Sequence, residues 1–95
     1  MALLDLLGRR WSLRILWELR ASPLNFRDLR ERCEMPSPTI LNTRLAELRA
    51  AAVVELGPAG YQLSDEGRKL VEILLPFHHW AERWARRAAR QDRTR

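Results

Sequence analysis

Four hydrogen-bonding side chains between positions 39 and 44 are of the types that recognise nucleic acids: Thr39, Asn42, Thr43 and Arg44. Asparagine and arginine can each form two hydrogen bonds with a base edge, and threonine can bond a base or a phosphate. Leu41, Leu45 and Leu48 recur at spacings of four and three, which places them on one face of a helix. We therefore predict a helix whose leucines face a core and whose threonine and asparagine side chains face outward. Arg44 lies nearer the edge of this outward face, where it could instead anchor a phosphate.

Two short helices over residues 25–51 must position these side chains. Ser37 followed by Pro38 is a strong helix start, because the hydroxyl can accept a hydrogen bond from a free backbone N–H and the proline needs no such bond. Asn25 is a similar cap for the helix before it. The three residues 34–36 leave room only for a tight turn, which is the spacing of a helix-turn-helix. Two amphipathic helices with a short loop also occur in helical bundles, so this stretch alone leaves a DNA role open.

The two predicted helix starts are also expected to contact a phosphate backbone, because free N–H groups there favour anions. The residues that we place at these contacts are Asn25, Arg27, Ser37 and Pro38.

The length and composition of the chain fit one small cytoplasmic domain. Ninety-five residues with 46% hydrophobic content can form one core. No stretch approaches the roughly 18 apolar residues of a membrane span, and the first residues lack the pattern of a secretory signal. The single cysteine excludes an intramolecular disulfide, and no cysteine pair has zinc spacing.

The formal charge of +5 is concentrated at one end of the chain. Residues 83–95 contain six arginines and one acid, whereas residues 1–82 contain eleven bases and eleven acids. Such a basic end either contacts phosphates or is a solvated end of the chain, so the net charge alone does not establish nucleic-acid binding.

Both ends of the chain carry more apolar side chains than a small core requires. The segment 2–7 has four leucines, and a long helix predicted over 64–90 has a wide apolar face, with a basic tail over 91–95. Pro76 should kink or split this helix near Leu75. This excess of apolar side chains predicts a homodimer contact, although the apolar face of the long helix could instead pack entirely on the protein's own core. The residues that we place at the dimer contact are Leu3, Leu4, Leu7, Phe77, Trp80 and Trp84.

Between the two predicted helical regions, residues 53–63 change to a period of two around a Gly-Pro-Ala-Gly turn, which predicts a short hairpin. A further core helix is expected over 11–20, with Ser12 as its cap. The order of these elements predicts a mainly α protein with a small β-hairpin, a winged helix-turn-helix. It has a three-helix core, a two-stranded wing and a long C-terminal dimerisation helix in one domain over 1–95.

Four ordered motifs resemble the HxlR family of bacterial winged-helix transcription regulators. The run from Leu3 to Leu19, LLDLLGRRWSLRILWEL, is similar to that family's opening "LxxLGGKWTLLILxEL". The segment from Pro23 to Leu29 is similar to its "GPLRFxEL". Ser37, Pro38, Leu41, Arg44, Leu45 and Leu48 match its "ISPxxLxxRLxxL", and Leu63, Ser64, Gly67 and Leu70 match its "LTxxGxxL". The resemblance implies a homodimer joined by the first and last helices, with one recognition helix per subunit in successive major grooves of a pseudo-palindromic operator.

Departures from the family limit what the resemblance implies. Arg9 and Arg10 replace a glycine and a lysine in the first motif. Many members have a redox-active cysteine ahead of the first helix, and this chain has none there, so we do not expect that thiol sensing. Cys33 lies on the predicted buried stripe of its helix, and we favour a structural thiol over a sensor. The predicted wing is shorter than usual in the family and its turn has no Lys or Arg, so strong minor-groove contact is not expected.

Nothing in the chain predicts an enzyme, a cofactor or a metal site. His78 and His79 are adjacent and would point about 100° apart on a helix, so they cannot readily chelate one ion. No nucleophile, base and acid set, glycine-rich phosphate loop or paired carboxylate motif is present. The main interpretation is a sequence-specific regulator that binds double-stranded DNA as a homodimer. The alternatives are a winged-helix module that docks another protein, or an unrelated three-helix scaffold without the hairpin.

Overall fold

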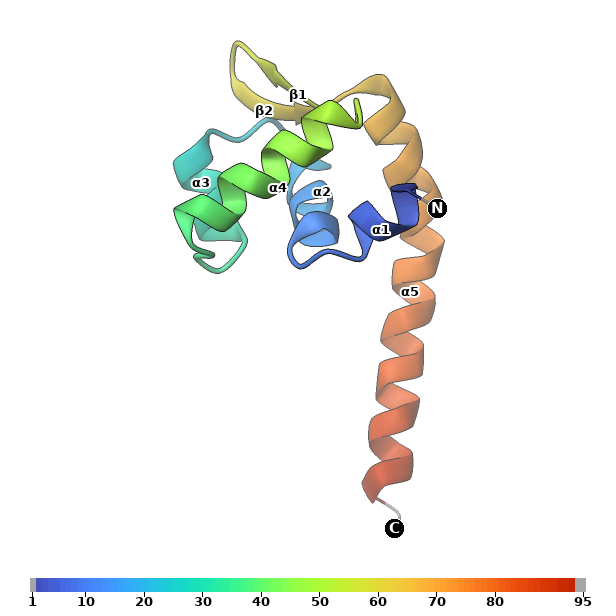
Figure 1. The fold of residues 1–95 in the computed structure, drawn as a ribbon. Coiled ribbons are helices and arrows are strands. Elements are labelled where there is room, and N and C mark those ends of the chain that lie inside the picture. Colours follow the sequence, from blue (N-terminus) through green and yellow to red (C-terminus); the bar gives the residue numbers. More distant parts are fainter. Residues whose placement is uncertain (1, 94–95) are drawn as a thin grey trace.

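The computed structural model describes residues 2–93 and contains five helices and one hairpin within them (Figure 1). The elements in chain order are α1 Ala2–Leu7, α2 Ser12–Leu19, α3 Phe26–Arg32, α4 Pro38–Ala50, β1 Val54–Gly57, β2 Gly60–Leu63 and α5 Asp65–Arg93. The fold is a winged helix-turn-helix, as the order of motifs predicted. Helix α5 extends well beyond the other elements, and the molecule measures 51 × 26 × 25 Å (Figure 1).

One apolar cluster joins α2, α3, α4 and the hairpin. Burial of these side chains removes apolar surface from water, which is the main force that holds such a small domain together. The fully buried positions include the leucine stripe of α4, so the periodicity of that helix predicted its inner face correctly. The buried residues are Ile15, Leu16, Leu19, Leu24, Leu29, Cys33, Leu41, Leu45, Leu48, Val53, Val54 and Leu63.

The hairpin is antiparallel and is tied to the start of the helix-turn-helix. Val54 pairs with Leu63 and Gly57 pairs with Gly60. Leu24, which precedes α3, and Tyr61 of β2 exchange backbone hydrogen bonds of 3.0 and 2.8 Å. Gly60 has φ 124°, and a Cβ there would lie 2.5 Å from the Leu24 carbonyl oxygen, so only glycine fits this close approach. The wing thereby holds the chain immediately before α3.

Helix α5 starts in close contact with the core. The Ser64 hydroxyl accepts a hydrogen bond from the Gly67 N–H at 3.0 Å and donates one to the Ala52 carbonyl at 2.6 Å. A Cβ on Gly67 would lie 2.0 Å from the Val53 carbonyl oxygen, so this glycine lets the helix meet the backbone just before β1.

Of the kink or split expected at Pro76, the split is absent, and the expectation that Ser12 caps α2 is wrong. Helix α5 continues through Pro76 to Arg93 as one element, so it does not split near Leu75, and its continuation takes up the first residues of the expected 91–95 tail. Residues 94 and 95 of that tail lie outside the described part of the chain. Ser12 does not cap α2, because the cap position is Trp11, in left-handed geometry at φ 77°. Ser12 is the first helical residue, and its hydroxyl is buried without a hydrogen-bond partner.

Candidate nucleic-acid interface

Helix α4 presents a small, polar outer face and buries a purely aliphatic inner face. Leu41, Leu45 and Leu48 are at most 1% exposed. Thr39, Asn42, Thr43 and Ala46 are all exposed on the other side of the helix. Large side chains on this outer face would hold the helix axis away from a base edge, whereas threonine, asparagine and alanine allow close approach. The structure therefore brings three of the four predicted base-reading residues together on one open surface.

The Thr43 hydroxyl already forms one hydrogen bond within α4. It donates to the Thr39 carbonyl oxygen at 2.9 Å. This bond uses the hydroxyl proton, whereas the oxygen of the exposed side chain can still accept a hydrogen bond. Thr43 can thus accept a hydrogen bond or contact a thymine methyl group, while Asn42 retains both donor and acceptor groups.

The two predicted caps are both present. The Asn25 Oδ1 accepts a hydrogen bond from the Asp28 N–H at 2.8 Å, and the Ser37 Oγ accepts one from the Ile40 N–H at 3.1 Å. Pro38 follows as the first helical residue of α4, where its missing N–H costs nothing. These side chains therefore order the helix starts, and the neighbouring free N–H groups are what an anion would meet.

Arg27 is a predicted backbone contact with a side chain that is open to solvent. Its side chain is 87% exposed and lies 3.8 Å from the Glu31 carboxylate, one helical turn further along α3. An exposed pair of this kind contributes little to stability, so the guanidinium is available to a phosphate.

The turn between α3 and α4 is held by its own backbone and by Arg30. Glu34 and Met35 both have left-handed geometry, with φ of 65° and 61°. The Met35 N–H donates to the Arg30 carbonyl oxygen at 2.8 Å, and the Arg30 Nε donates to the Pro36 carbonyl oxygen at 2.7 Å. The angle at which α4 leaves α3 is therefore fixed by hydrogen bonds that do not involve the outer face.

Arg44 is placed differently from the other predicted base-reading residues. Its Nη1 donates to Glu47 Oε1 at 2.6 Å, and its Nε donates to the Arg10 carbonyl oxygen at 2.9 Å. The side chain is only 20% exposed. The structure thus directs this guanidinium toward the turn between α1 and α2, away from the open face that carries Asn42 and Thr43.

Two residues near this face were not singled out from the sequence. Arg49 is exposed one turn beyond Ala46 and continues the line from Asn42. Glu47 binds both Arg44 and Arg9. The Arg44 and Glu47 pair could have been found from its i, i+3 spacing, but the contribution of Arg9 depends on the tertiary structure.

A second exposed surface consists of large apolar side chains on α1 and α5. Leu3 and Leu4 are exposed on α1, and Phe77, Trp80 and Trp84 are exposed on α5. Ile73, which was not among the predicted interface residues, is 72% exposed and extends the α5 stripe at helical spacing. Leu7 differs, because it is half-buried and packs against the protein's own core. The aromatic stripe is continuous, with ring centroids 6.0 Å apart for Phe77 and Trp80 and 6.3 Å for Trp80 and Trp84.

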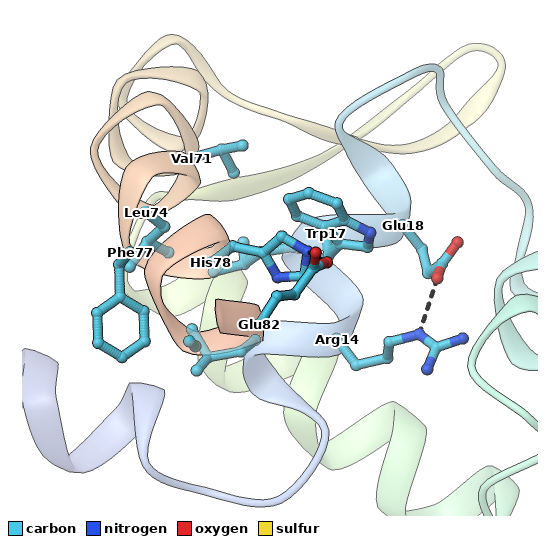
Figure 2. A pocket seen from close by; sticks show the side chains of 11 residues that line it. Arg14, Trp17, Glu18, Val71, Leu74, Phe77, His78 and Glu82 are labelled. Atoms are coloured by element: carbon cyan, nitrogen blue, oxygen red, sulfur yellow. Dashed lines mark hydrogen bonds and ion pairs between the residues drawn. The ribbon is translucent and has the colours of Figure 1, made fainter. Parts of the chain in front are cut away.

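A groove of about 620 Å³ lies between α2 and α5. Figure 2 shows Trp17 of α2 and His78 of α5 in contact within it, with ring centroids 4.2 Å apart, while the Phe77 ring points away from this pair. The His78 Nε2 lies 2.6 Å from a Glu82 oxygen, and Arg14 pairs with Glu18 at 2.7 Å. The polar groups at its rim thus pair with one another. Within residues 2–93 no group of three or more candidate metal ligands occurs.

Cys33 lies at the end of α3 and is fully buried. Desolvation raises the pKa of its thiol from 9.0 to about 11, and the nearby Arg14 only partly offsets this. The thiol is therefore protonated at neutral pH, which suits a packing residue.

No helix within the described part of the chain has both the length and the apolar character needed to cross a membrane.

Comparison with known proteins agrees with this geometry. Quinone-bound YodB from B. subtilis is 30% identical, with a TM-score of 0.79 over 86% of this chain and 93% of that one. A possible HxlR family transcriptional factor from Thermoplasma volcanium is 27% identical, with a TM-score of 0.81 over 88% of this chain and 82% of that one. A regulator from Enterococcus faecalis described as a member of the MarR family is 26% identical, with a TM-score of 0.77 over 92% of this chain and 86% of that one.

No curated protein matches the chain. The family model described as HxlR-like helix-turn-helix matches residues 6–89, which include every element from α2 to β2, the end of α1 and most of α5. This span contains the open face of α4 and both capped helix starts. The chain therefore belongs to the HxlR-like helix-turn-helix family of DNA-binding transcription regulators.

Proposed function

We propose that this regulator binds a specific operator as a homodimer, with α4 of each subunit in successive major grooves of a pseudo-palindromic site. The observation that carries the proposal is the division of α4 into a fully buried leucine stripe and an open face of small hydrogen-bonding side chains. A regulator of this kind acts at the chromosome, so we propose the cytoplasm as its location.

The side chains of the open face would have distinct roles. Asn42 and Thr43 meet base edges in the major groove, and Thr39 reaches a base or a nearby phosphate. Arg49, at the far end of the same face, binds a phosphate or a guanine. Arg44, which the sequence placed among these contacts, has a structural role in this proposal because its guanidinium is already engaged.

Phosphate contacts would come from the helix starts and Arg27. The N–H groups exposed beside Asn25 and Ser37 favour anions, and Pro38 shapes the start of α4. The hairpin contributes little charge, because residues 53–63 contain no Lys or Arg. Affinity is therefore expected to depend on α4 and the helix starts rather than on the wing.

The dimer would be formed through the exposed apolar surface of α1 and α5. Four large side chains in a line on α5, together with Leu3 and Leu4, make a larger apolar patch than scattered surface residues do. A second copy that covers this patch would remove it from water and would provide the second recognition helix.

The experiment that tests the proposal is selection of bound fragments from the source genome, followed by titration of an enriched site. Thr43→Glu places a negative charge on the open face, opposite the DNA phosphates. We expect operator affinity to fall by about 100-fold or more while the melting temperature changes by only a few degrees. Ala89→Glu is the matched control, because it adds the same charge to an exposed position on α5.

Three outcomes would contradict parts of the proposal. Failure to enrich any sequence would favour a winged-helix module that docks another protein. Unchanged affinity for Thr43→Glu would mean that a different face binds DNA. A monomer at micromolar concentration on the operator would exclude the dimer.

A further inference from the structure

A cluster of three charged residues joins α4 to the turn between α1 and α2. The Glu47 carboxylate accepts a hydrogen bond from Arg44 Nη1 at 2.6 Å through one oxygen and is bound by Arg9 Nη1 through the other. Arg44 also donates from Nε to the Arg10 carbonyl oxygen at 2.9 Å. One carboxylate therefore holds two guanidinium groups from different parts of the chain.

Both arginines in this cluster contact α4, the helix of the proposed DNA-binding face, although the Arg44 guanidinium points away from that face, toward the turn between α1 and α2. Arg44 follows Thr43 directly in α4, and the Arg9 guanidinium reaches the same helix at Glu47. The Arg9 side chain is 53% exposed, so it could reach an external phosphate if it were released. Glu47 is the only acidic residue in α4. Within residues 2–93, no other carboxylate forms an ion pair with Arg9 or Arg44.

Sequence-independent affinity for DNA depends mainly on the number of phosphates that cationic side chains neutralise. Such contacts carry no direct sequence information. An acid that occupies two arginines therefore lowers the affinity for all sequences, including the many non-specific sites with which an operator competes.

The same cluster fixes the position of α4 relative to α1 and α2. The side chains of Arg44 and Glu47 are only 20% and 23% exposed, so the contact is packed as well as charged. The turn itself is ordered, because the Ser12 N–H donates to the Arg9 carbonyl and the Arg9 N–H donates to the Leu6 carbonyl, both at 3.2 Å. Base readout requires α4 in one orientation, whereas non-specific contact tolerates several.

We propose that Glu47 is a specificity-determining residue, which keeps Arg9 and Arg44 off the DNA phosphates and holds the recognition helix in its reading position. This inference rests on the proposed function of α4, and it assigns a role in DNA specificity to an acidic residue of that helix. Glu47 itself does not contact the operator in this proposal; it acts through the two arginines.

The test compares the wild-type protein with Glu47→Gln on an operator fragment and on an unrelated fragment over a range of salt concentrations. Glutamine keeps the size of the side chain but not its charge. On the unrelated fragment, each released arginine should steepen the slope of log affinity against log salt by about 0.9, so we expect a change of about 1 to 2. Each added contact also makes the affinity loss between 50 and 200 mM salt about 3.5-fold larger. The affinity for the operator should not rise in proportion, so the ratio of specific to non-specific affinity should fall at least threefold.

Two further variants separate this effect from a change in net charge. Glu72→Gln removes one exposed carboxylate from α5 and should leave the salt slope and the ratio unchanged. Adding Arg9→Gln and Arg44→Gln to Glu47→Gln should return the salt slope on the unrelated fragment to the wild-type value.

Arg9→Gln alone provides a test that does not depend on folding of the Glu47 variant. Since Arg9 is held by Glu47 in the wild-type protein, its removal should not change the salt slope. A slope shallower by about 1 would show that Arg9 already binds a phosphate, and it would overturn the inference. The melting temperature shows whether the Glu47→Gln protein folds. If it folds and its affinities for the operator and for the unrelated fragment rise equally, or if neither rises, the inference is also overturned. If the wild-type protein selects no sequence, the proposed function fails instead, and the inference fails with it.

Discussion

Helices α4 and α5 both have one face toward the core and one face toward solvent, but their solvent faces differ in chemistry. The exposed face of α4 carries Thr39, Asn42 and Thr43, and its inner face is fully buried. The exposed face of α5 carries Phe77, Trp80 and Trp84, and this helix extends beyond the domain (Figure 1). A small polar face can enter a groove of DNA, whereas a contiguous patch of exposed aromatic side chains is typical of a surface that another apolar surface covers.

The difference shows which part of each helix depends on a partner. Helix α4 is completed by its own domain, so its position should persist without DNA or a second subunit. The C-terminal half of α5 has few contacts with the core, and its order should depend on association. The following predictions test this contrast, beginning with the largest expected effect.

Truncation of the inner face of α4 should destabilise the whole domain. Leu45→Ala removes a side chain that is 1% exposed and leaves a cavity, so we expect a loss of about 3 kcal/mol in the free energy of unfolding. For a domain of this size, the melting temperature should fall by roughly 10–20 °C, as measured by circular dichroism. Ala46→Ser changes the neighbouring exposed residue and should alter stability by less than about 0.5 kcal/mol. Similar effects of the two substitutions would contradict the division of α4 into inner and outer faces.

Truncation of the exposed face of α5 should weaken association and leave the domain folded. Trp80→Ala combined with Trp84→Ala removes two stacked aromatic side chains, and each buried aromatic anchor at an interface is worth about 2 kcal/mol. We expect dimer dissociation to increase by at least about 30-fold in sedimentation equilibrium, with the near-ultraviolet signal of the core retained. His79→Ala, on a different face of α5, serves as the control. If the double variant remained as tightly associated as the wild-type protein, the aromatic stripe would not be the dimer contact.

The smallest effect concerns Cys33, which belongs to the core that α4 completes. Its pKa is raised from 9.0 to about 11, so the folded protein holds the thiol proton more tightly than the unfolded chain does. The stabilisation is therefore complete below pH 9 and is lost as the pH rises toward 11, with about 1 kcal/mol lost by pH 10. Cys33→Ala should lower stability at pH 7, and its stability should lack this decline between pH 8 and 10. The measurement is urea unfolding of both proteins across that range, and parallel pH profiles would contradict the assignment.

Much of the helix-turn-helix was predictable because its signals are local. The caps at Asn25 and Ser37 and the proline after Ser37 act within one turn of helix, and both caps have the predicted hydrogen bonds. The leucine stripe of α4 follows from periodicity alone. The hairpin was recognisable from alternation around a turn, and its strands lie within the predicted residues.

The features that the sequence did not predict concern residues whose environment depends on distant parts of the chain. Arg44 was placed at the DNA because its type and position suit that role, but its guanidinium is held by Glu47 and by the turn before α2. Leu7 was assigned to the dimer contact with its neighbours, but it packs half-buried on the core. Ser12 was expected to cap α2. The cap position is instead Trp11, and the Ser12 hydroxyl is buried.

By itself, the sequence determined the order of the elements, the inner and outer faces of α4, and the excess of apolar side chains on α5. These features depend on neighbours three or four positions apart, whose types are known without the fold. Only the tertiary structure decided which guanidinium groups are free and which are held, because an ion pair such as Arg9 with Glu47 joins residues 38 positions apart. A charge has no assigned partner until the chain has brought distant segments together, and in this protein that step separates an exposed guanidinium such as that of Arg27 from one that is already held, such as that of Arg44.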